Sequence, residues 1–288
     1  MSEMAEIIRV AQLDDADECG RICYRAFADI ADRHGFPHDF PSVDAATRAC
    51  ASMIGHPRFY GVVAEQNGRV VGSNFLDERS PIYSVGPITV DPDTQNRRVG
   101  RVLMGALLDR ATQQRAPGVR LVQAAYHNRS LSLYTQLGFV VREPLATLQG
   151  APPPTEVKGC TVRSAIADDI DACNAVCVMV HGHDRGGELR DAVEQGLATV
   201  VERAGRIVAY STGIGFFAHA VAQSNDDLRA LIGAAPSIGG PGVIVPLRNT
   251  ELLRWCLERG LRLVHTLNLM TIGSYHQPRG VYLPSIGY

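Results

Sequence analysis

The stretch QNRRVGRVLMGALLDRATQ, residues 95–113, joins a predicted strand to a predicted helix. Immediately before it, GPITVDP (Gly86–Pro92) is a β-branched run that ends in proline, which is typical of a strand and its end. Within the stretch, apolar residues recur at the spacing of one helix face: Leu103, Leu107, Leu108 and Ala111. Basic residues and a glycine therefore lie where a strand leads into a helix.

A helix start of this composition suits an anion. It exposes amide donors that have no intrahelical partner, and it carries a partial positive charge. A loop that leads into it therefore favours a phosphate group. Gly100 lets the backbone approach such a ligand closely, and Arg97, Arg98 and Arg101 can add charge-assisted hydrogen bonds. The spacing is neither a Walker A loop, which needs GK[ST], nor GxGxxG.

Length and composition limit the class of protein. A chain of 288 residues suggests two domains or one large one, and 45% apolar with 20% charged residues is ordinary for a globular protein. A net charge of −2 argues against a nucleic-acid or anionic-membrane partner. The N-terminus does not resemble a signal peptide and no run of apolar residues is long enough to span a membrane, so we expect a cytoplasmic protein.

The seven cysteines include no CxxC pair, so the sequence predicts neither a zinc site nor a disulfide framework, and we expect no metal. Cys19 and Cys23, like Cys173 and Cys177, lie four residues apart, which favours buried positions on a helix face.

The sequence contains an internal repeat. RVAQLDDADECGRIC (residues 9–23) aligns without a gap on RSAIADDIDACNAVC (163–177), and both predict a strand end followed by an acidic helix start. VVAEQNGRVVG (62–72) aligns on TVVERAGRIVA (199–209), each typical of a hairpin. A third match pairs GVRLV with GLRLV; these begin at Gly118 and Gly260. Three matches in one order indicate a duplicated domain.

The repeat and a proline-rich segment define the expected domains. QGAPPPTE, residues 149–156, predicts a stiff extended linker between a first domain over 1–148 and a second over 157–288. Each half is expected to run strand, helix, hairpin, strand, helix, strand. That order predicts an α/β (α+β) fold with a mixed, mostly antiparallel sheet flanked by helices, rather than a doubly wound sheet.

The arginine–glycine junction resembles the acyl-CoA signature [QR]-x-x-G-x-[GA] of the GNAT superfamily of N-acyltransferases. Its residues here are Arg97, Arg98, Val99, Gly100, Arg101 and Val102, with Val102 departing from the last position of the pattern. The resemblance implies that the amides of residues 97–102 bind the pyrophosphate of CoA. It also implies that the preceding strand, Ile88, Thr89 and Val90, pairs its backbone with the pantetheine arm. The non-functional alternative is a solvated basic helix start.

A second segment is similar to the late part of the same family. HNRSLSLYTQLGF, residues 127–139, predicts a short helix with Asn128 as its N-cap and Gly138 at its end. By the resemblance, Tyr134 is the general acid that protonates the departing CoA thiolate; the alternative is a core tyrosine. Residues implied to contact CoA are His127, Asn128 and Ser130, and either His127 or Asn128 takes the position that asparagine holds in many relatives.

The general base is harder to place. An amine must lose a proton before it attacks a thioester, and a carboxylate commonly accepts it. NFLDERSP places Asp77 and Glu78 at the end of the strand before GPITV, and alternation turns only one of them toward the cleft. Glu78 is our candidate, with ordinary loop charges as the alternative, and Asp91 is expected at the surface.

The second half lacks both signatures. We align its strand GVIVP (242–246) with GPITVDP, and LRNTELLRWCLERG, which follows, contains no tract like residues 97–102. TIGSYHQPRG is too rich in glycine and proline to repeat the tyrosine helix. HGHDRGG (181–187) is read as a loop with incidental histidines and residues 216–232 as a packed helix.

These observations predict a tandem GNAT protein with a degenerate second copy. The expected activity is that of an acetyl-CoA-dependent N-acetyltransferase, in which a small-molecule primary amine attacks the thioester directly. The alternative is a non-catalytic acyl-CoA sensor. A homodimer is compatible with the sequence, and the identity of the amine is left open.

Overall fold

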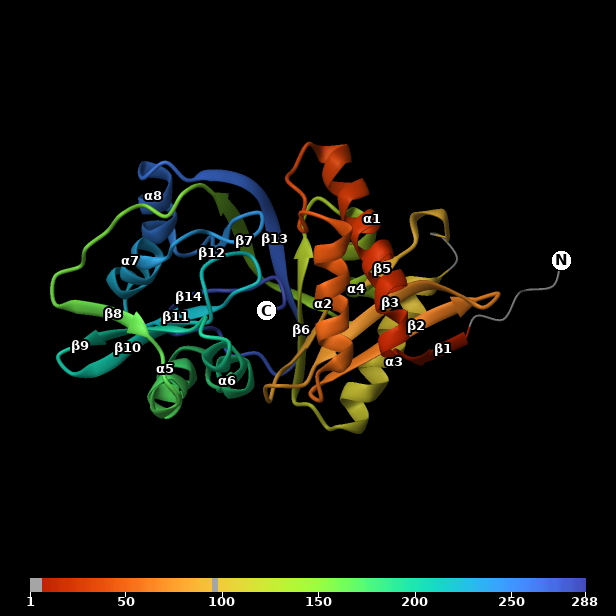
Figure 1. The fold of residues 1–288 in the computed structure, drawn as a ribbon, viewed down its shortest axis with the longest axis horizontal. Helices are drawn as coiled ribbons and strands as arrows, with labels where there is room; N and C mark the ends of the chain where they lie inside the picture. The colour runs from red at the N-terminus through yellow and green to blue at the C-terminus, as the bar shows by residue number, and fades with distance from the viewer. Residues whose placement is uncertain (1–6, 95–97) are drawn as a thin grey trace. The chain divides into compact units, whose positions relative to one another are not determined.

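The computed structural model describes residues 7–94 and 98–288 and divides into two compact units. Unit 1 comprises Met1–Glu78 and Ile82–Arg120, and unit 2 comprises Arg79–Pro81 and Leu121–Tyr288. Strand β6 (Gly118–Ala124) begins in unit 1 and ends in unit 2 (Figure 1). No helix in the described ranges is long and apolar enough to cross a membrane.

Unit 1 contains a mixed sheet with the strand order β1-β2-β3-β4-β6. β4 pairs with β6 in parallel, and the other described strand pairs of this unit are antiparallel. A further short strand, β5, pairs with β3. The bounds are β1 (Ile7–Val10), β2 (Phe59–Gln66), β3 (Arg69–Asp77), β4 (Tyr83–Val85) and β5 (Thr89–Val90).

Helices cover both faces of this sheet: α1 (Ala16–His34) and α2 (Val43–Gly55) on one face and α3 (Val99–Gln113) on the other. Side chains alternate along β3, so its neighbours identify the faces. Phe75 packs in one apolar cluster with Cys19, Cys23 and Cys50 of α1 and α2. On the opposite face, Asn74 donates a hydrogen bond to Met104 of α3.

Unit 2 contains two sheets and the remaining helices. The strand order of the first is β6-β13-β7-β12, and that of the second is β14-β11-β10-β9-β8. The strands are β7 (Val140–Gln149), β8 (Cys160–Ser164), β9 (Thr199–Arg203), β10 (Arg206–Ser211), β11 (Ala220–Ala222), β12 (Val243–Pro246), β13 (Arg262–Gly273) and β14 (Val281–Leu283). The helices are α4 (Asn128–Gln136), α5 (Ile170–His181), α6 (Gly186–Glu194), α7 (Asn225–Ala234) and α8 (Thr250–Glu258).

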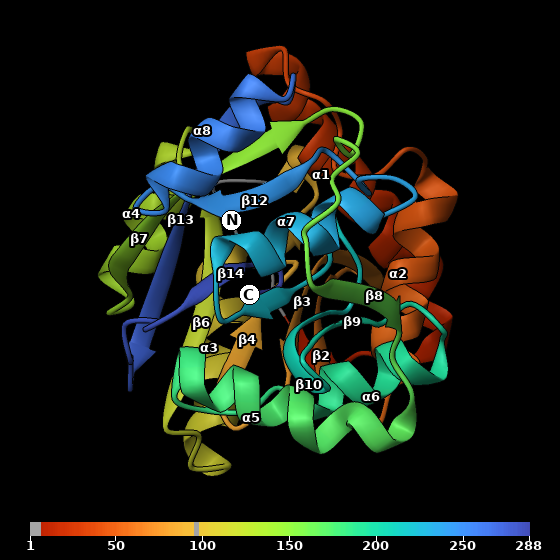
Figure 2. The same cartoon turned by 90° about the vertical axis from the view of Figure 1, so that its left-hand side faces the viewer.

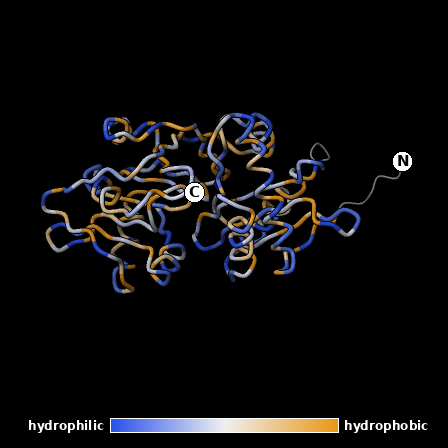
Figure 3. The backbone as a smooth tube through the Cα atoms, turned by 45° about the horizontal axis from the view of Figure 1, so that its top comes forward, coloured by the Kyte–Doolittle hydropathy of each residue, from blue (hydrophilic) through white to orange (hydrophobic). Residues whose placement is uncertain are grey.

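The second sheet of unit 2 is covered on both faces, as Figure 2 shows. Val201 packs in one apolar cluster with residues of α7 and α8, whereas its neighbour Val200 packs in another with residues of α5 and α6. Apolar stretches in Figure 3 alternate with hydrophilic ones along the chain, as expected for strands and helices that bury one side. Cys173 and Cys177, like Cys19 and Cys23, are buried on their helices, which confirms the prediction from their spacing.

The repeat is confirmed by an ion-pair motif that occurs twice. In each half, an arginine on the first strand binds a carboxylate before the first helix and a glutamate on the neighbouring strand. The first set is Arg9, Asp15 and Glu65, with N–O distances of 2.7 and 2.9 Å. The second set is Arg163, Asp169 and Glu202, with distances of 2.7 and 2.5 Å. The matching residues therefore have matching structural roles.

Element order corrects two of the sequence alignments. After the hairpins β2–β3 and β9–β10, the elements β5, α3, β6, α4 and β7 correspond in order to β11, α7, β12, α8 and β13. GVIVP forms β12 and is thus the counterpart of β6, not of GPITVDP. GLRLV opens β13, the counterpart of β7, so its match with GVRLV in β6 pairs non-equivalent strands. Residues 216–232, expected as one helix, contain β11 and most of α7.

The last strands of the two halves are exchanged. β7, from the first half, pairs antiparallel with β12 and β13 of the second half, while β13 is also a neighbour of β6. For this reason the compact units divide after Arg120 rather than at the expected boundary near residue 148. Residues 151–157, in the expected linker region, contain neither helix nor strand.

Candidate functional site

The two elements β5 and α3, which precede and follow the signature junction, both pack closely on β3. Gly72 of β3 faces Val90 across the ladder, and a Cβ at Gly72 would lie 2.8 Å from the Thr89 carbonyl oxygen and 3.1 Å from Leu103 of α3. Only glycine permits this approach without a shift. β5 pairs with β3 along one edge, and no described strand pairs with its other edge. That edge can therefore accept an extended ligand by backbone pairing.

The start of α3 leaves amide groups available for an anion. Arg98 precedes the helix in a left-handed conformation (φ 64°), no side chain caps this end among the described residues, and its first turn contains no acidic residue. The amides of Arg101 and Val102 donate to the Arg98 carbonyl. Val99 and Gly100 therefore supply the amides that precede the first intrahelical bond. Such a terminus favours a negatively charged group.

Other residues that the family resemblance assigned to CoA binding are Arg97, Val102, Ile88 and Thr89. Arg97 lies outside the described residues. Val102, the departure from the family pattern, has a side chain that is 41% exposed on the first turn of α3. Ile88 lies just outside β5, and the Thr89 hydroxyl lies 3.3 Å from that of Ser73. The side chain of Thr89 is therefore committed to the sheet, which leaves its backbone for ligand contact.

Asp91, expected at the surface, is instead buried at the end of β5 with 5% of its surface exposed. Arg21 and Arg25 of α1 approach its carboxylate at 3.6 and 3.4 Å, and one carboxylate oxygen accepts a hydrogen bond from the Asp93 amide. These bonds hold the beginning of the β5–α3 turn against α1. The sequence carried no signal for this role, because it depends on two arginines about 70 residues away.

Glu78 is also buried, at 8% exposure, and is bound by a partner on α3. Both of its carboxylate oxygens accept hydrogen bonds from Arg110, at 2.8 and 3.0 Å. Arg110 lies over the Tyr60 ring at 4.9 Å, and its hydrogen bonds to Glu78 raise the pKa of the guanidinium. A proton-accepting role for Glu78 therefore requires an oxygen lone pair that Arg110 does not occupy.

In unit 2, the segment expected to contact CoA is held by a glutamine that sequence reasoning missed. α4 begins at Asn128, and the capping position is His127, without a side-chain cap, rather than Asn128. Buried Gln123 of β6 donates to the His127 carbonyl at 3.1 Å and to the Ser130 hydroxyl at 3.0 Å. Asn268 of β13 in turn donates to Gln123 at 2.9 Å. Ser130 thus fixes the start of α4.

One face of α4 borders an open recess of about 390 Å³. Its lining residues are Asn128, Arg129, Ser132, Leu133 and Gln136. Of the two residues considered for the ligand-facing position, Asn128 lines this recess. His127 is not among the lining residues.

Tyr134 lies on the opposite, buried side of α4, with 7% of its surface exposed. Its ring packs against Phe139, with centroids 6.0 Å apart. Burial raises the pKa of the phenol well above its ordinary value. Tyr134 therefore keeps its proton at neutral and moderately alkaline pH, which is a requirement for a general acid.

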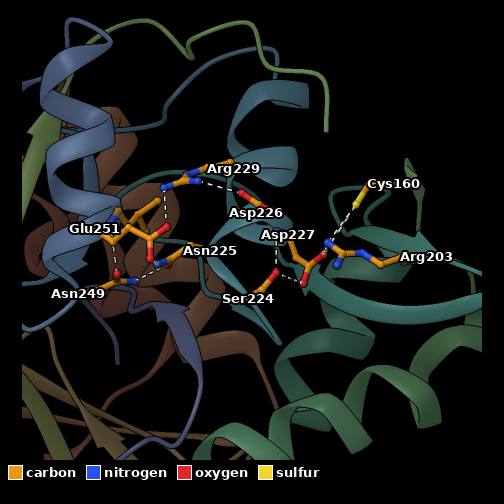
Figure 4. A network of polar contacts seen from close by, with 10 residues as sticks. Cys160, Arg203, Ser224, Asn225, Asp226, Asp227, Arg229, Asn249 and Glu251 are labelled. Atoms are coloured by element: carbon orange, nitrogen blue, oxygen red, sulfur yellow. Dashed lines mark hydrogen bonds and ion pairs between the residues drawn. The ribbon is translucent and has the colours of Figure 1, made fainter. Parts of the chain in front are cut away.

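In the second half, the helix that corresponds to α3 is α7, and nearby side chains of the protein already bind the groups at its start (Figure 4). Ser224 caps α7 by accepting from the Asp227 amide, and the first turn contains Asp226 and Asp227. Arg203 binds Asp227 at 2.5 Å, and Arg229 binds Asp226 at 2.9 Å. The Ser224 cap and the two aspartates make the start of α7 unfavourable for a phosphate group. The sequence placed this counterpart at α8 instead.

Metal ligands are not gathered in the described part of the chain: no group of three or more His, Cys, Asp or Glu side chains there is placed to hold an ion. All seven cysteines are free thiols. HGHDRGG differs from the expectation of an incidental loop, since His181 ends α5 and is buried at 1% exposure.

Comparisons with known proteins give a family for part of the chain and a shared fold for most of it. Residues 23–139 match the model of the acetyltransferase (GNAT) family. A Pyrococcus horikoshii protein assigned as an acetyltransferase has a TM-score of 0.78 at 18% identity, covering 98% of this chain and 94% of that one. The GCN5-related N-acetyltransferase from Sphaerobacter thermophilus gives 0.59 at 16% identity, covering 94% and 96%. At these identities the two structures establish a shared fold.

A curated relative of known sequence is the UPF0157 protein YqkA of Bacillus subtilis, 28% identical over 95 residues. The match covers 33% of this chain and 26%, about a quarter, of that protein. The family model matches less than half of the chain, and over residues 23–139 it defines an acetyltransferase (GNAT) family domain. The fold of the chain as a whole is shared with the two solved structures.

Proposed function

We propose that the chain is an acetyl-CoA-dependent N-acetyltransferase that acts on a small primary amine. The start of α3 carries this proposal: no described side chain caps it, its first turn contains no acidic residue, and Arg98 precedes it in a left-handed conformation. α7 has the equivalent place in the second half but is capped by Ser224 and begins with two aspartates. The contrast favours nucleotide binding by the first half alone.

The proposed reaction is direct transfer. The amine nitrogen attacks the thioester carbonyl carbon, the carbon–sulfur bond breaks, and the thiolate takes the proton of the Tyr134 hydroxyl. The amine gives up its proton to Glu78, directly or through water. An acyl-enzyme on Cys19, Cys173 or Cys256 is disfavoured because burial raises the pKa of each of these thiols to about 12, so they stay protonated.

Calorimetric titration with CoA and acetyl-CoA tests binding, and thiol release across a panel of primary amines tests turnover. We expect binding of both nucleotides and turnover of at least one amine. Tyr134→Phe should bind acetyl-CoA normally but lose roughly 10²-fold or more in kcat. Absence of CoA binding by the folded chain contradicts the proposal, whereas binding without turnover for every amine identifies an acyl-CoA sensor instead.

A further inference from the structure

A second polar site lies in unit 2, away from the elements described above. It is formed where the end of α5, the start of α6, the β10–β11 loop and the C-terminal segment meet. We call it the His181–His219 cluster. Its members are His181, His183, Arg185, Glu188, Thr212, His219, Tyr282 and Tyr288.

Two imidazoles form the centre of the cluster. His181 Nε2 and His219 Nε2 lie 3.2 Å apart, and each residue is 1% exposed. The His181 ring meets Tyr282 edge-on, with centroids 4.8 Å apart. Thr212 fixes the position of His219, since its hydroxyl accepts from the His219 amide at 3.0 Å. One imidazole donates and the other accepts, so the pair is held in a defined orientation.

A buried guanidinium adjoins this pair. Arg185 is 6% exposed, lies over the Tyr288 ring at 4.6 Å, and bonds Glu188 through Nε at 2.7 Å and through Nη2 at 2.5 Å. Its Nη1 is buried and has no hydrogen-bond partner within the described residues. The same holds for His219 Nδ1. Buried polar atoms in folded proteins are nearly always hydrogen-bonded, so both atoms indicate a missing partner.

The chemistry of these atoms specifies that partner. Nη1 of an arginine can only donate, and His219 Nδ1 donates when its Nε2 accepts from His181, so both atoms suit a small acceptor that carries negative charge, such as a carboxylate. Three residues of the cluster, His183, Glu188 and Thr212, are only half-buried and so are partly exposed to solvent. We infer that the His181–His219 cluster is a binding site for a small carboxylate, held by Arg185 Nη1 and His219 Nδ1.

Charge balance adds a measurable signature. Glu188 already neutralises Arg185, so a bound carboxylate leaves an excess negative charge that one imidazole can offset by taking up a proton. Burial, followed by the nearby Arg185, lowers the pKa of His219 well below its ordinary value, so His219 is neutral at pH 7.5 before ligand binds. The other titratable groups that face the cluster are Cys177, Asp184, Tyr210, Tyr282 and Tyr288. Binding should therefore be coupled to proton uptake.

Acetate is the first probe and inorganic phosphate the second, each titrated calorimetrically into the full chain at pH 7.5 and pH 6.0. We expect saturable acetate binding that tightens by up to about tenfold per pH unit, with proton uptake seen by comparing two buffers. Arg185→Met with Glu188→Gln, which avoids an unpaired carboxylate, should abolish binding, as should His219→Phe. Arg229→Met, which removes ion pairs elsewhere in the same half, is the control and should bind acetate normally.

Several results overturn the inference. If neither anion gives a saturable response, the site holds only water and the inference is wrong. If phosphate binds and acetate does not, the site is specific for a phosphoryl group and not for a carboxylate. Retention of acetate binding in the Arg185→Met/Glu188→Gln variant places the ligand elsewhere. Because these measurements use neither CoA nor turnover, their outcome is independent of the acetyltransferase proposal.

Discussion

Arg79 Nη1 lies 2.7 Å from Asp191 Oδ2, and this ion pair fastens the loop between β3 and β4 to helix α6. The loop, Arg79–Pro81, belongs to unit 2 by its contacts, although the residues on either side of it in the chain belong to unit 1. A Cβ at Gly187 would lie 2.4 Å from the Arg79 carbonyl oxygen. The degenerate copy thus holds the segment that directly follows the candidate base, Glu78.

Gly187→Ala should disturb that segment, because the new methyl group must displace the backbone of Arg79. We expect faster amide hydrogen exchange over residues 79–85 and a fall of roughly tenfold in kcat/KM for the amine, with unchanged affinity for CoA. Gly105→Ala in α3 is the matched control, since nothing lies within 4 Å of its added Cβ. Equal exchange rates in the two variants contradict this role for α6.

The basic turn before α3 can be tested without straining the backbone. Arg98→Gly keeps the left-handed conformation and removes the charge, so CoA affinity should fall by about five- to tenfold, most at low salt. Arg115, at the other end of α3, also has a positive φ of 56°. Arg115→Gly should leave CoA affinity unchanged. If both variants bind CoA like the parent chain, the Arg98 side chain does not contribute to phosphate binding.

Variants of the two members of the Glu78–Arg110 ion pair can distinguish a catalytic role of Glu78 from a structural one. If Glu78 is the base, Glu78→Gln lowers kcat and removes the acidic limb of the pH–rate profile, whereas Arg110→Met frees the carboxylate and preserves turnover. We expect this pattern, together with a stability loss of about 1–3 kcal/mol in Arg110→Met from the unpaired carboxylate. Equal losses of stability with unaltered pH profiles in both variants assign Glu78 to structure alone.

Unfolding should become easier in mild acid. Burial lowers the pKa of His265 to about 4, so the folded state binds fewer protons there than the unfolded state, whose histidine pKa is 6.5. The stabilising effect of a neutral His265 is complete above pH 6.5 and is lost as the pH falls toward 4. Lowering the pH from 7.5 to 5 should therefore reduce the free energy of unfolding by about 2 kcal/mol through this histidine alone. Urea unfolding of His265→Phe, whose neighbours include Tyr126 and Phe216, should show that much less pH dependence.

Features encoded in contiguous residues were predictable from the sequence. The helix face from Leu103 to Ala111, the hairpins, and the repeat around Arg9 and Arg163 depend on local spacing, and each is present. The mixed, mostly antiparallel sheet was predicted for the same reason. Counterparts in the second half were misplaced because short apolar strands such as β6, β12 and β13 resemble one another, so a five-residue match cannot identify a strand.

Long-range pairing is what the sequence could not provide. Arg110 binds Glu78 across 32 residues, and Gln123 binds Asn268 across 145, so neither partner could be found by local reasoning. The same holds for Asp91, which looks like a solvent-exposed turn residue until α1 is placed beside it. Buried His181 was read as incidental because its partner His219 lies 38 residues further along the chain.

The exchanged strands have a consequence for how this duplication can evolve. Both edges of β7 are paired with strands encoded after the linker. Deleting the second copy would therefore leave both edges of β7 unpaired and exposed to water, which favours aggregation. The helix starts of that copy carry no such constraint. Selection could therefore change them freely, while the strands of the same copy remained necessary to pair both edges of β7.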